Sequence, residues 1–115
     1  MKIKDHANKI LLLDNLISHN LKLINFFQSD LSKLKILLIT MKSHYEGQNQ
    51  TIEKIIEKLP KDISSRAHQL NCITDATVKG YLIKETSKSD LRKKYLKPSA
   101  ELITQFEKYI NLYSK

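Results

Sequence analysis

Residues 80–99, GYLIKETSKSDLRKKYLKPS, decide the fold of this chain. An apolar, β-prone run at residues 81–83 follows a glycine, and a second such run at residues 95–96 precedes a proline. The polar segment between the two runs is rich in serine and threonine, which favour turns. The stretch therefore predicts a two-stranded β-hairpin in which residues 81–85 pair with residues 92–96.

Positive charge is concentrated in the same stretch. Its basic residues are Lys84, Lys88, Arg92, Lys93, Lys94 and Lys97, and its acidic residues are Glu85 and Asp90. Six positive charges against two negative ones leave +4, which is half of the formal +8 of the 115-residue chain. A basic segment of this kind favours a polyanionic partner, nucleic acid first.

Two short helices are predicted directly before the hairpin. The first begins near Thr51 and ends at Pro60, because proline stops a helix. A tight turn then leads into the second helix, over residues 64–79, with Asp62 or Ser64 as its N-cap. Helix, turn, helix and basic hairpin in this order are the parts of a winged helix-turn-helix, which reads DNA. The predicted fold class is mainly α with a small β-hairpin (α+β).

The helix at residues 64–79 divides into two sides at the helical period. A moderately apolar side, predicted to face the core, holds Ile63, Ala67, Leu70, Thr74 and Thr77. A polar side, predicted to be exposed, holds Ser65, His68, Gln69, Cys72, Asp75, Ala76 and Lys79. Hydroxyl and amide groups at the start of such a helix reach phosphates and base edges, and glutamine pairs bidentately with adenine. The polar side is therefore either the DNA-reading surface or merely solvated.

The first half of the chain reads as two further helices. Apolar residues recur every three or four positions over residues 3–27, which predicts one long helix that is apolar on more than one side. Such a helix is either a core helix or a self-association helix. Ser29 and Asp30 are good N-caps for a second helix over residues 31–41, and residues 43–49 form the predicted loop after it.

The C-terminal segment predicts a fifth helix. Ser99 is its expected N-cap, and its aromatic and aliphatic residues suit a protein interface better than a DNA surface. The length of the chain suits one domain, residues 1–115. Its expected parts are an N-terminal helix (1–28), a helix-turn-helix core (30–80), a wing (81–97) and a C-terminal helix (98–115).

The hairpin also resembles the wing of the MarR-type regulators. The residues that carry the resemblance are Gly80, Asp90, Arg92, Leu96 and Ser99, in the order of that family's wing. Ser99 stands where the family has Thr, and Pro98 and Leu102 stand where it usually has Leu and Gly. Counted back from Gly80, the family's apolar spacing places Gln69 where a buried Val is common. The resemblance implies that Asp90 holds Arg92 at the wing tip for DNA contact; alternatively, the pair only stiffens the hairpin. It also implies a homodimer through the N- and C-terminal helices, although no segment of this sequence is expected to form the family's last helix. A small-molecule effector is compatible with the resemblance, but no residue marks its pocket.

The candidate DNA-binding residues follow from the helix and the wing together. They are Ser64, Ser65, Arg66, His68, Gln69, Lys84, Lys88, Asp90, Arg92, Lys93 and Lys94. Gln69, Ser65 and His68 are expected to discriminate bases in the major groove. The wing lysines are expected to contact phosphates, which carry no sequence information.

Other chemistry finds little support in the sequence. The four histidines are far apart and include no i,i+4 pair, so a metal site would have to be assembled by the fold, and none is predicted. No nucleophile elbow, glycine-rich phosphate loop or cofactor motif is present, so no enzyme is expected. The single Cys72 excludes an internal disulfide and fits a reducing cytoplasm; it is either an exposed redox sensor or a buried, inert thiol.

Three classes of function compete. The first is a MarR-like, DNA-binding transcriptional regulator, supported by the order of elements and by the nine basic against four acidic residues of the segment 60–97. The second is a winged-helix interaction or assembly module that does not read DNA. The third, a peripheral membrane protein, is disfavoured because the first helix is not strongly basic, and no apolar run is long enough to span a bilayer.

Overall fold

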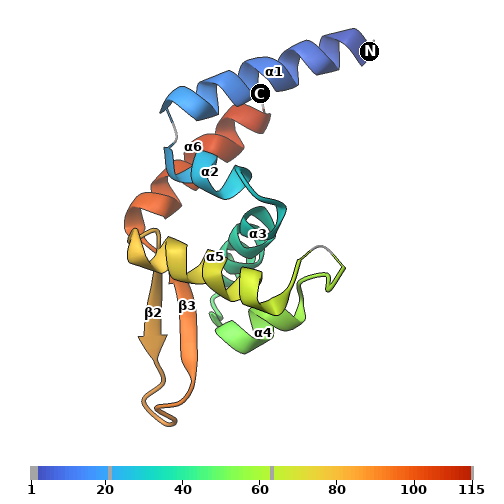
Figure 1. Cartoon of the computed structure of the whole chain (residues 1–115). Coiled ribbons are helices and arrows are strands. Elements are labelled where there is room, and N and C mark those ends of the chain that lie inside the picture. Colours follow the sequence, from blue (N-terminus) through green and yellow to red (C-terminus); the bar gives the residue numbers. More distant parts are fainter. Residues whose placement is uncertain (1–2, 21, 63, 115) are drawn as a thin grey trace.

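The computed structural model describes residues 3–20, 22–62 and 64–114. Within these ranges there are six helices and three strands, in the order expected of a winged helix-turn-helix (Figure 1). They are α1 (Ile3–Asn20), α2 (Lys22–Gln28), α3 (Leu31–Tyr45), β1 (Gln50–Thr51), α4 (Ile52–Glu57), α5 (Arg66–Val78), β2 (Leu82–Thr86), β3 (Lys94–Pro98) and α6 (Ala100–Ser114). The predicted fold class is confirmed, with one helix and one strand more than expected.

The hairpin is present, but its register differs from the predicted one. Strands β2 and β3 pair antiparallel, with Leu82 opposite Pro98 and Thr86 opposite Lys94. The predicted pairing of residues 81–85 with 92–96 is therefore wrong. Pro98, which was expected to end the strand, lies at the last position of the ladder, where a missing amide donor costs little.

The loop of the hairpin explains the shift in register. The backbone amide of Ser87 donates to the carbonyl of Lys93 at 3.0 Å, which continues the pairing beyond the strands. The Ser87 hydroxyl accepts from the backbone amides of Ser89 and Asp90, both at 3.3 Å. One inward-facing hydroxyl thus organises the tip, and periodicity alone does not reveal such a contact.

A third strand joins the hairpin to the helix-turn-helix. β1 pairs antiparallel with β3, with Gln50 opposite Leu96 and Thr51 opposite Tyr95, so the sheet order is β1-β3-β2. The predicted two-stranded sheet is therefore corrected to a three-stranded one. β1 has only two residues, and its contacts are non-local, so no local sequence signal identifies it.

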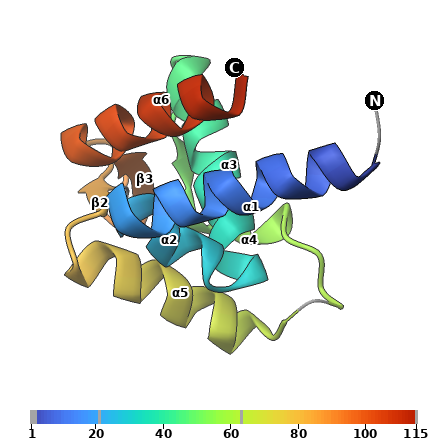
Figure 2. The same ribbon diagram turned by 90° about the horizontal axis from the view of Figure 1, so that it is seen from above.

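The single helix predicted over residues 3–27 is also corrected. It is two helices, α1 and α2, whose axes run in different directions (Figures 1 and 2). Leu23, Ile24 and Phe27 of α2 are buried, whereas residues 3–12 of α1 are exposed. The spacing of apolar residues indicates which side of a helix is buried, but it does not reveal where one helix ends and the next begins in another direction.

Helix ends are set largely by the expected capping side chains. Asp30 caps α3 by accepting from the amides of Ser32 at 2.7 Å and Lys33 at 3.3 Å. Ser99 begins α6, since its hydroxyl accepts from the amide of Leu102 at 3.1 Å. α3 continues to Tyr45, beyond the predicted end, and the loop follows with Gly47 at a φ of +77°, a conformation that favours glycine.

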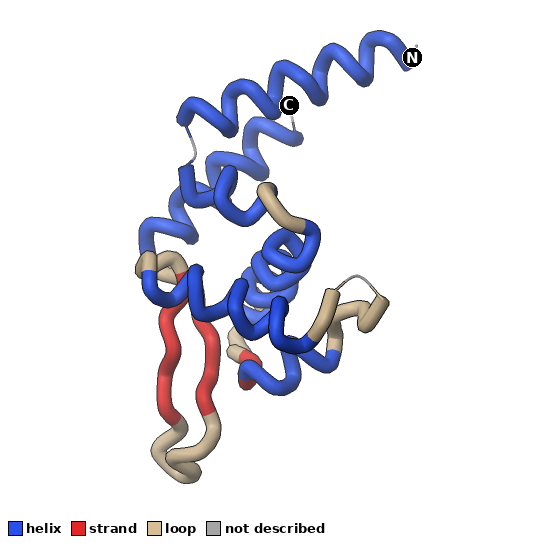
Figure 3. The backbone as a smooth tube through the Cα atoms, viewed as in Figure 1, coloured by secondary structure: helices blue, strands red, loops and turns tan. Residues whose placement is uncertain are grey.

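The core lies where α2, α3, α4, α5, the sheet and α6 meet. The fully buried side chains include Phe27, Ile36, Leu37, Ile55, Ile73, Leu82, Leu96 and Leu102, so each of these elements contributes. α5 lies near the start of α3, and α6 lies near its end (Figure 2). The wing extends from this core away from α1, and its loop is the most distant part of the hairpin (Figure 3).

Candidate nucleic-acid interface

The wing tip presents an arginine that a neighbouring carboxylate holds. Asp90 Oδ1 accepts from the backbone amide of Arg92 at 3.0 Å and from its Nε at 3.4 Å. The Arg92 side chain is nevertheless 92% exposed. The guanidinium is thus anchored at one nitrogen and open at the others, which suits contact with a phosphate or a narrow groove.

The other basic side chains of the wing fall into two groups. Lys84, Lys88 and Lys93 are exposed, and Lys94 is exposed with its Nζ donating to Thr86 Oγ1 at 2.8 Å. Lys97 pairs with Glu85 at 2.9 Å, so its charge is compensated within the hairpin. The positive charge that is available to a ligand therefore lies in the outer part of the wing.

A basic hollow separates the wing from the start of α4. It has a volume of about 290 Å³ and is lined by Thr51, Ile52, Glu53, Lys54, Arg92, Lys93 and Lys94. The lining brings three consecutive basic residues of the wing close to Lys54 of α4, against a single carboxylate. This hollow is chemically suited to an anionic group such as a phosphate.

The predicted division of α5 is wrong in part. Gln69, Cys72 and Ala76, which were expected to be exposed, are buried together with Ile73. The other members of that predicted side, Ser65, His68, Asp75 and Lys79, are exposed, and Ile63 lies outside the described residues. Burial of the Gln69 amide is tolerated because its Nε2 donates to the carbonyl of Ser64 at 3.3 Å. Gln69 is only 4% exposed and does not present its amide to a groove.

Two residues that were expected to face the core, Ala67 and Thr74, are exposed. Asn71 and Val78, which were assigned to neither side, are exposed as well. Asn71 and Thr74 are the polar members with base-reading capacity, since asparagine pairs with adenine and threonine contacts several base edges. The position of Ile73 could have revealed the buried side, because a β-branched apolar residue in the middle of a helix indicates the core. Gln69, Cys72 and Ala76 are buried on the same side as Ile73.

Three predicted site residues at the start of α5, Ser64, Ser65 and Arg66, make internal contacts. The hydroxyls of Ser64 and Ser32 share a hydrogen bond, and Ser65, not Asp62 or Ser64, is the N-cap of α5. Arg66 Nη2 lies 2.8 Å from both carboxylate oxygens of Glu53 on α4. These residues position the helix, whereas the predicted wing residues gather at one exposed tip.

Sequence comparisons find no match, whereas structural comparisons find proteins of the same fold. Neither a protein-family model nor a curated protein matches it. A MarR-like transcription regulator from Bacillus cereus ATCC 10987 superimposes with a TM-score of 0.59 at 15% identity, over 96% of this chain and 73% of that chain. A SlyA-like regulator from Listeria monocytogenes gives 0.54 at 18% identity, over 99% and 69%. This chain has the fold of the MarR-type regulators.

A third structure extends the MarR-type likeness. The heme sensor protein PefR from Streptococcus agalactiae, in complex with heme, superimposes with a TM-score of 0.52 at 20% identity, over 96% of this chain and 76% of that chain. The first two structures are described as transcription regulators. The expected MarR-type fold is therefore confirmed, from a sequence only 15–20% identical to these three proteins.

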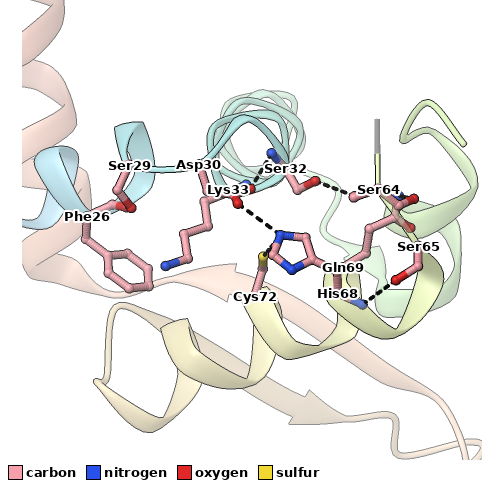
Figure 4. A network of polar contacts seen from close by, with 10 residues as sticks. All are labelled: Phe26, Ser29, Asp30, Ser32, Lys33, Ser64, Ser65, His68, Gln69 and Cys72. Atoms are coloured by element: carbon pink, nitrogen blue, oxygen red, sulfur yellow. Dashed lines mark hydrogen bonds and ion pairs between the residues drawn. The ribbon is translucent and has the colours of Figure 1, made fainter. Parts of the chain in front are cut away.

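A polar cluster inside the MarR-type unit was not foreseen. His68 of α5 does not point to solvent alone: its Nε2 lies 2.9 Å from Asp30 Oδ2 and 3.5 Å from Cys72 Sγ (Figure 4). Burial opposes ionisation of Asp30, but the hydrogen bonds from His68, Ser32 and Lys33 outweigh it and lower the pKa of that carboxyl. Burial, followed by the charge of Asp30, raises the pKa of the Cys72 thiol. Cys72 had been expected to be either an exposed redox sensor or a buried thiol, and it is buried.

A helix that crosses a lipid bilayer needs about 20 consecutive, mostly apolar residues. Among the described residues, no helix combines this length with the required apolar character.

Proposed function

We propose that this protein is a DNA-binding transcriptional regulator of MarR-like type. The observation that carries the proposal is the exposed Arg92, held by Asp90 at the tip of a basic wing beside the exposed face of α5. In a winged helix of this form, α5 would enter the major groove and the wing would reach the neighbouring minor groove or its phosphates. The proposal requires no catalytic residue and no cofactor.

We divide the contacts between helix and wing by their chemistry. Arg92, with Asp90 holding it, would contact a phosphate or a minor groove, and Lys84, Lys88, Lys93 and Lys94 would add phosphate contacts. Asn71 and Thr74 replace Gln69 as the candidates for base reading, because they lie on the exposed side of α5. Ser64, Ser65, Arg66 and His68 are assigned to positioning the helix.

Binding to duplex DNA at two salt concentrations tests the proposal directly. Fluorescence anisotropy with random duplexes should show binding that weakens steeply as salt rises, because lysine and arginine release counterions from phosphates. Selection from a random duplex library should then yield a preferred site. If no duplex binds at low salt, the alternative of a protein-interaction module that does not read DNA is favoured instead.

The Asn71→Ala variant should lose base discrimination. We expect a cost of about 1–3 kcal/mol on the selected site and little change on random duplexes, because a bidentate contact to one base is removed. Asn25→Ala is the matched control, since it removes an exposed asparagine from α2, and it should bind as the wild type does. If Gln69→Ala removes discrimination and Asn71→Ala does not, the assignment of the reading face is wrong.

A homodimer is the second part of the proposal. The described apolar side chains of α1 are strongly exposed, with Ile3 at 86%, Ile10 at 63%, Leu11 at 60% and Leu12 at 62%. Several strongly exposed apolar side chains on one helix are typical of an interface, and a two-fold dimer would read two half-sites about one helical turn apart. α6, with its neutral and partly aromatic sequence, would complete the interface.

The double variant Leu11→Lys, Leu12→Lys should convert the dimer to a monomer. Light scattering at tens of micromolar should report twice the chain mass for the wild type and the chain mass for the variant, because two charges would enter the interface. Val78→Lys, which charges an 80% exposed apolar residue on α5, is the control and should stay dimeric. A monomeric wild type would contradict the dimer.

The cellular setting follows from the proposed role. A regulator that reads duplex DNA works in the cytoplasm of a bacterial cell, and the buried, free Cys72 is compatible with a reducing compartment. Small-molecule control is not assigned to any cavity of the described residues.

A further inference from the structure

Three potential metal ligands from two parts of the chain meet beside α5. Asp30 comes from the N-cap of α3, while His68 and Cys72 lie one turn apart on α5. One ligand atom of each lies within 4.8 Å of the other two, with Nε2 of His68 2.9 Å from Asp30 Oδ2 and 3.5 Å from Cys72 Sγ. Figure 4 shows the imidazole between the carboxylate and the sulfur.

We propose that Asp30, His68 and Cys72 form a binding site for a divalent transition-metal ion of the zinc class. Thiolate, imidazole and carboxylate are the three side-chain ligands that zinc uses in proteins, at about 2.3, 2.0 and 2.0–2.2 Å. Tetrahedral bonds of these lengths separate the ligand atoms by about 3.3–3.7 Å. The Nε2–Sγ distance of 3.5 Å lies within that range and the Nε2–Oδ2 distance of 2.9 Å is shorter, while all three ligand atoms lie within 4.8 Å of one another. Side-chain movements of about 1 Å would therefore bring the three atoms to ligating distances.

The surroundings leave room for a fourth ligand. Cys72 is buried, but the side chains of His68 and Asp30 are 45% and 31% exposed, so the cluster opens to solvent on one side. Three protein ligands with water in the fourth position is a known arrangement for zinc. A soft sulfur among the ligands disfavours magnesium and calcium, which prefer oxygen ligands only.

The charges around the cluster are compatible with a cation. Asp30 is ionised and Asp75 lies near Cys72, whereas Lys33 is the nearby positive group. The Lys33 ammonium lies over the Phe26 ring, 4.2 Å from its centroid, and points away from the imidazole (Figure 4). A bound ion would take the place of the thiol proton, which would pass to solvent, and the neutral imidazole would bind through Nε2 with its own proton on Nδ1.

A metal ion here would act on the orientation of α5. It would tie the first half of α5 to the N-cap of α3 with bonds stronger than the present hydrogen bond. Because α5 is the proposed reading helix, we infer that the ion changes the affinity for DNA; this consequence rests on the proposed function, whereas the site itself does not.

Titration of the full chain with Co²⁺ tests the site by a direct signal. Cobalt bound tetrahedrally through a thiolate should give visible d–d bands and a sulfur-to-metal charge-transfer band, saturating at one ion per chain, and Zn²⁺ should displace it. Cys72→Ser should abolish the charge-transfer band. His68→Ala and Asp30→Asn should each lower the affinity at least about tenfold, since loss of even an outer partner of a ligand has that effect.

The variants separate ligation from folding. Asp30→Asn keeps a good N-cap for α3, and Cys72→Ala offers a second, small replacement if the serine variant is unstable. His44→Ala removes a histidine outside the cluster and should leave the cobalt spectrum unchanged. No charge-transfer band in the wild type, or the same band in folded Cys72→Ser, would overturn the site and leave His68–Asp30 as an ordinary ion pair.

A second measurement addresses the effect on DNA. Zn²⁺ should shift the duplex affinity of the wild type and leave that of Cys72→Ser unchanged. If the wild type binds cobalt through sulfur but its DNA affinity does not move, the coupling to α5 is overturned. If no duplex binds at all, the proposed function fails, while the cobalt spectrum still decides the metal site.

Discussion

The triple variant Arg92→Ala, Lys93→Ala, Lys94→Ala should bind every duplex much more weakly than the wild type. These residues are adjacent at the wing tip and line the basic hollow beside α4. Each lost phosphate contact should reduce the salt slope by about 0.9, so three contacts reduce it by about 2.7. Relative to 1 M salt, that corresponds to a loss of affinity of up to about 500-fold at 0.1 M. Anisotropy titrations at several salt concentrations measure both quantities.

The control for this variant removes the same charge elsewhere. Lys22→Ala, Lys35→Ala and Lys42→Ala together delete three exposed positive charges from α2 and α3, outside the wing and the proposed dimer interface. That variant should change the salt slope little. A triple wing variant with unchanged DNA affinity and lower thermal stability would show that Asp90 and Arg92 only stiffen the hairpin.

The Leu96→Ala variant should lose much of the stability of the fold. Leu96 is fully buried in β3, the central strand of the sheet, where it joins the base of the wing to the core. Removing a buried leucine side chain leaves a cavity as well as lost apolar contact, which costs about 2–5 kcal/mol of unfolding free energy. Urea denaturation followed by circular dichroism measures the change in midpoint.

Leu91→Ala is a control within the same hairpin. Leu91 is 75% exposed in the loop of the wing, so the same chemical change should alter stability by less than about 0.5 kcal/mol. Equal losses for both variants would contradict the placement of the two leucines. The pair therefore tests the observed register, which buries Leu96 and leaves the loop outside the core.

The wing was predictable because its signals are local. A glycine, a short apolar run, turn-forming residues and a second apolar run lie within one stretch, and strand pairing in a hairpin needs nothing beyond it. The family pair Asp90 and Arg92 adds a contact two residues apart, which the structure contains. The exact register was missed because the Ser87 hydroxyl, a single side chain in the loop, sets how far the ladder continues.

The reading face of α5 was not predictable from polarity. Its two sides differ little in apolar content, and the buried side includes a glutamine whose amide is satisfied by a backbone carbonyl from the preceding turn. A pattern of polar residues cannot reveal such a partner. Two signals indicated the core side: the position of Ile73 in mid-helix, and the MarR-type apolar spacing, which places Gln69 where a buried valine is common.

The polar cluster was missed for a related reason. A search for metal ligands that considers histidine pairs alone passes over His68 and Cys72, although their spacing places both on one side of a helix. Asp30 is 38 residues away along the chain, and its role as an N-cap already explained it. Only the packing of α3 against α5 brings the carboxylate to the imidazole.

The shortest strand of the structure has a mechanical consequence. Thr51 is paired with Tyr95 of the wing through β1, and its hydroxyl also caps α4 by accepting from the amide of Lys54 at 3.2 Å. The same residue therefore ends a strand and begins a helix, with no linker between them. A displacement of the wing tip would therefore be transmitted through β3 and Thr51 to the first turn of α4, so that the positions of the wing and the helix-turn-helix are coupled.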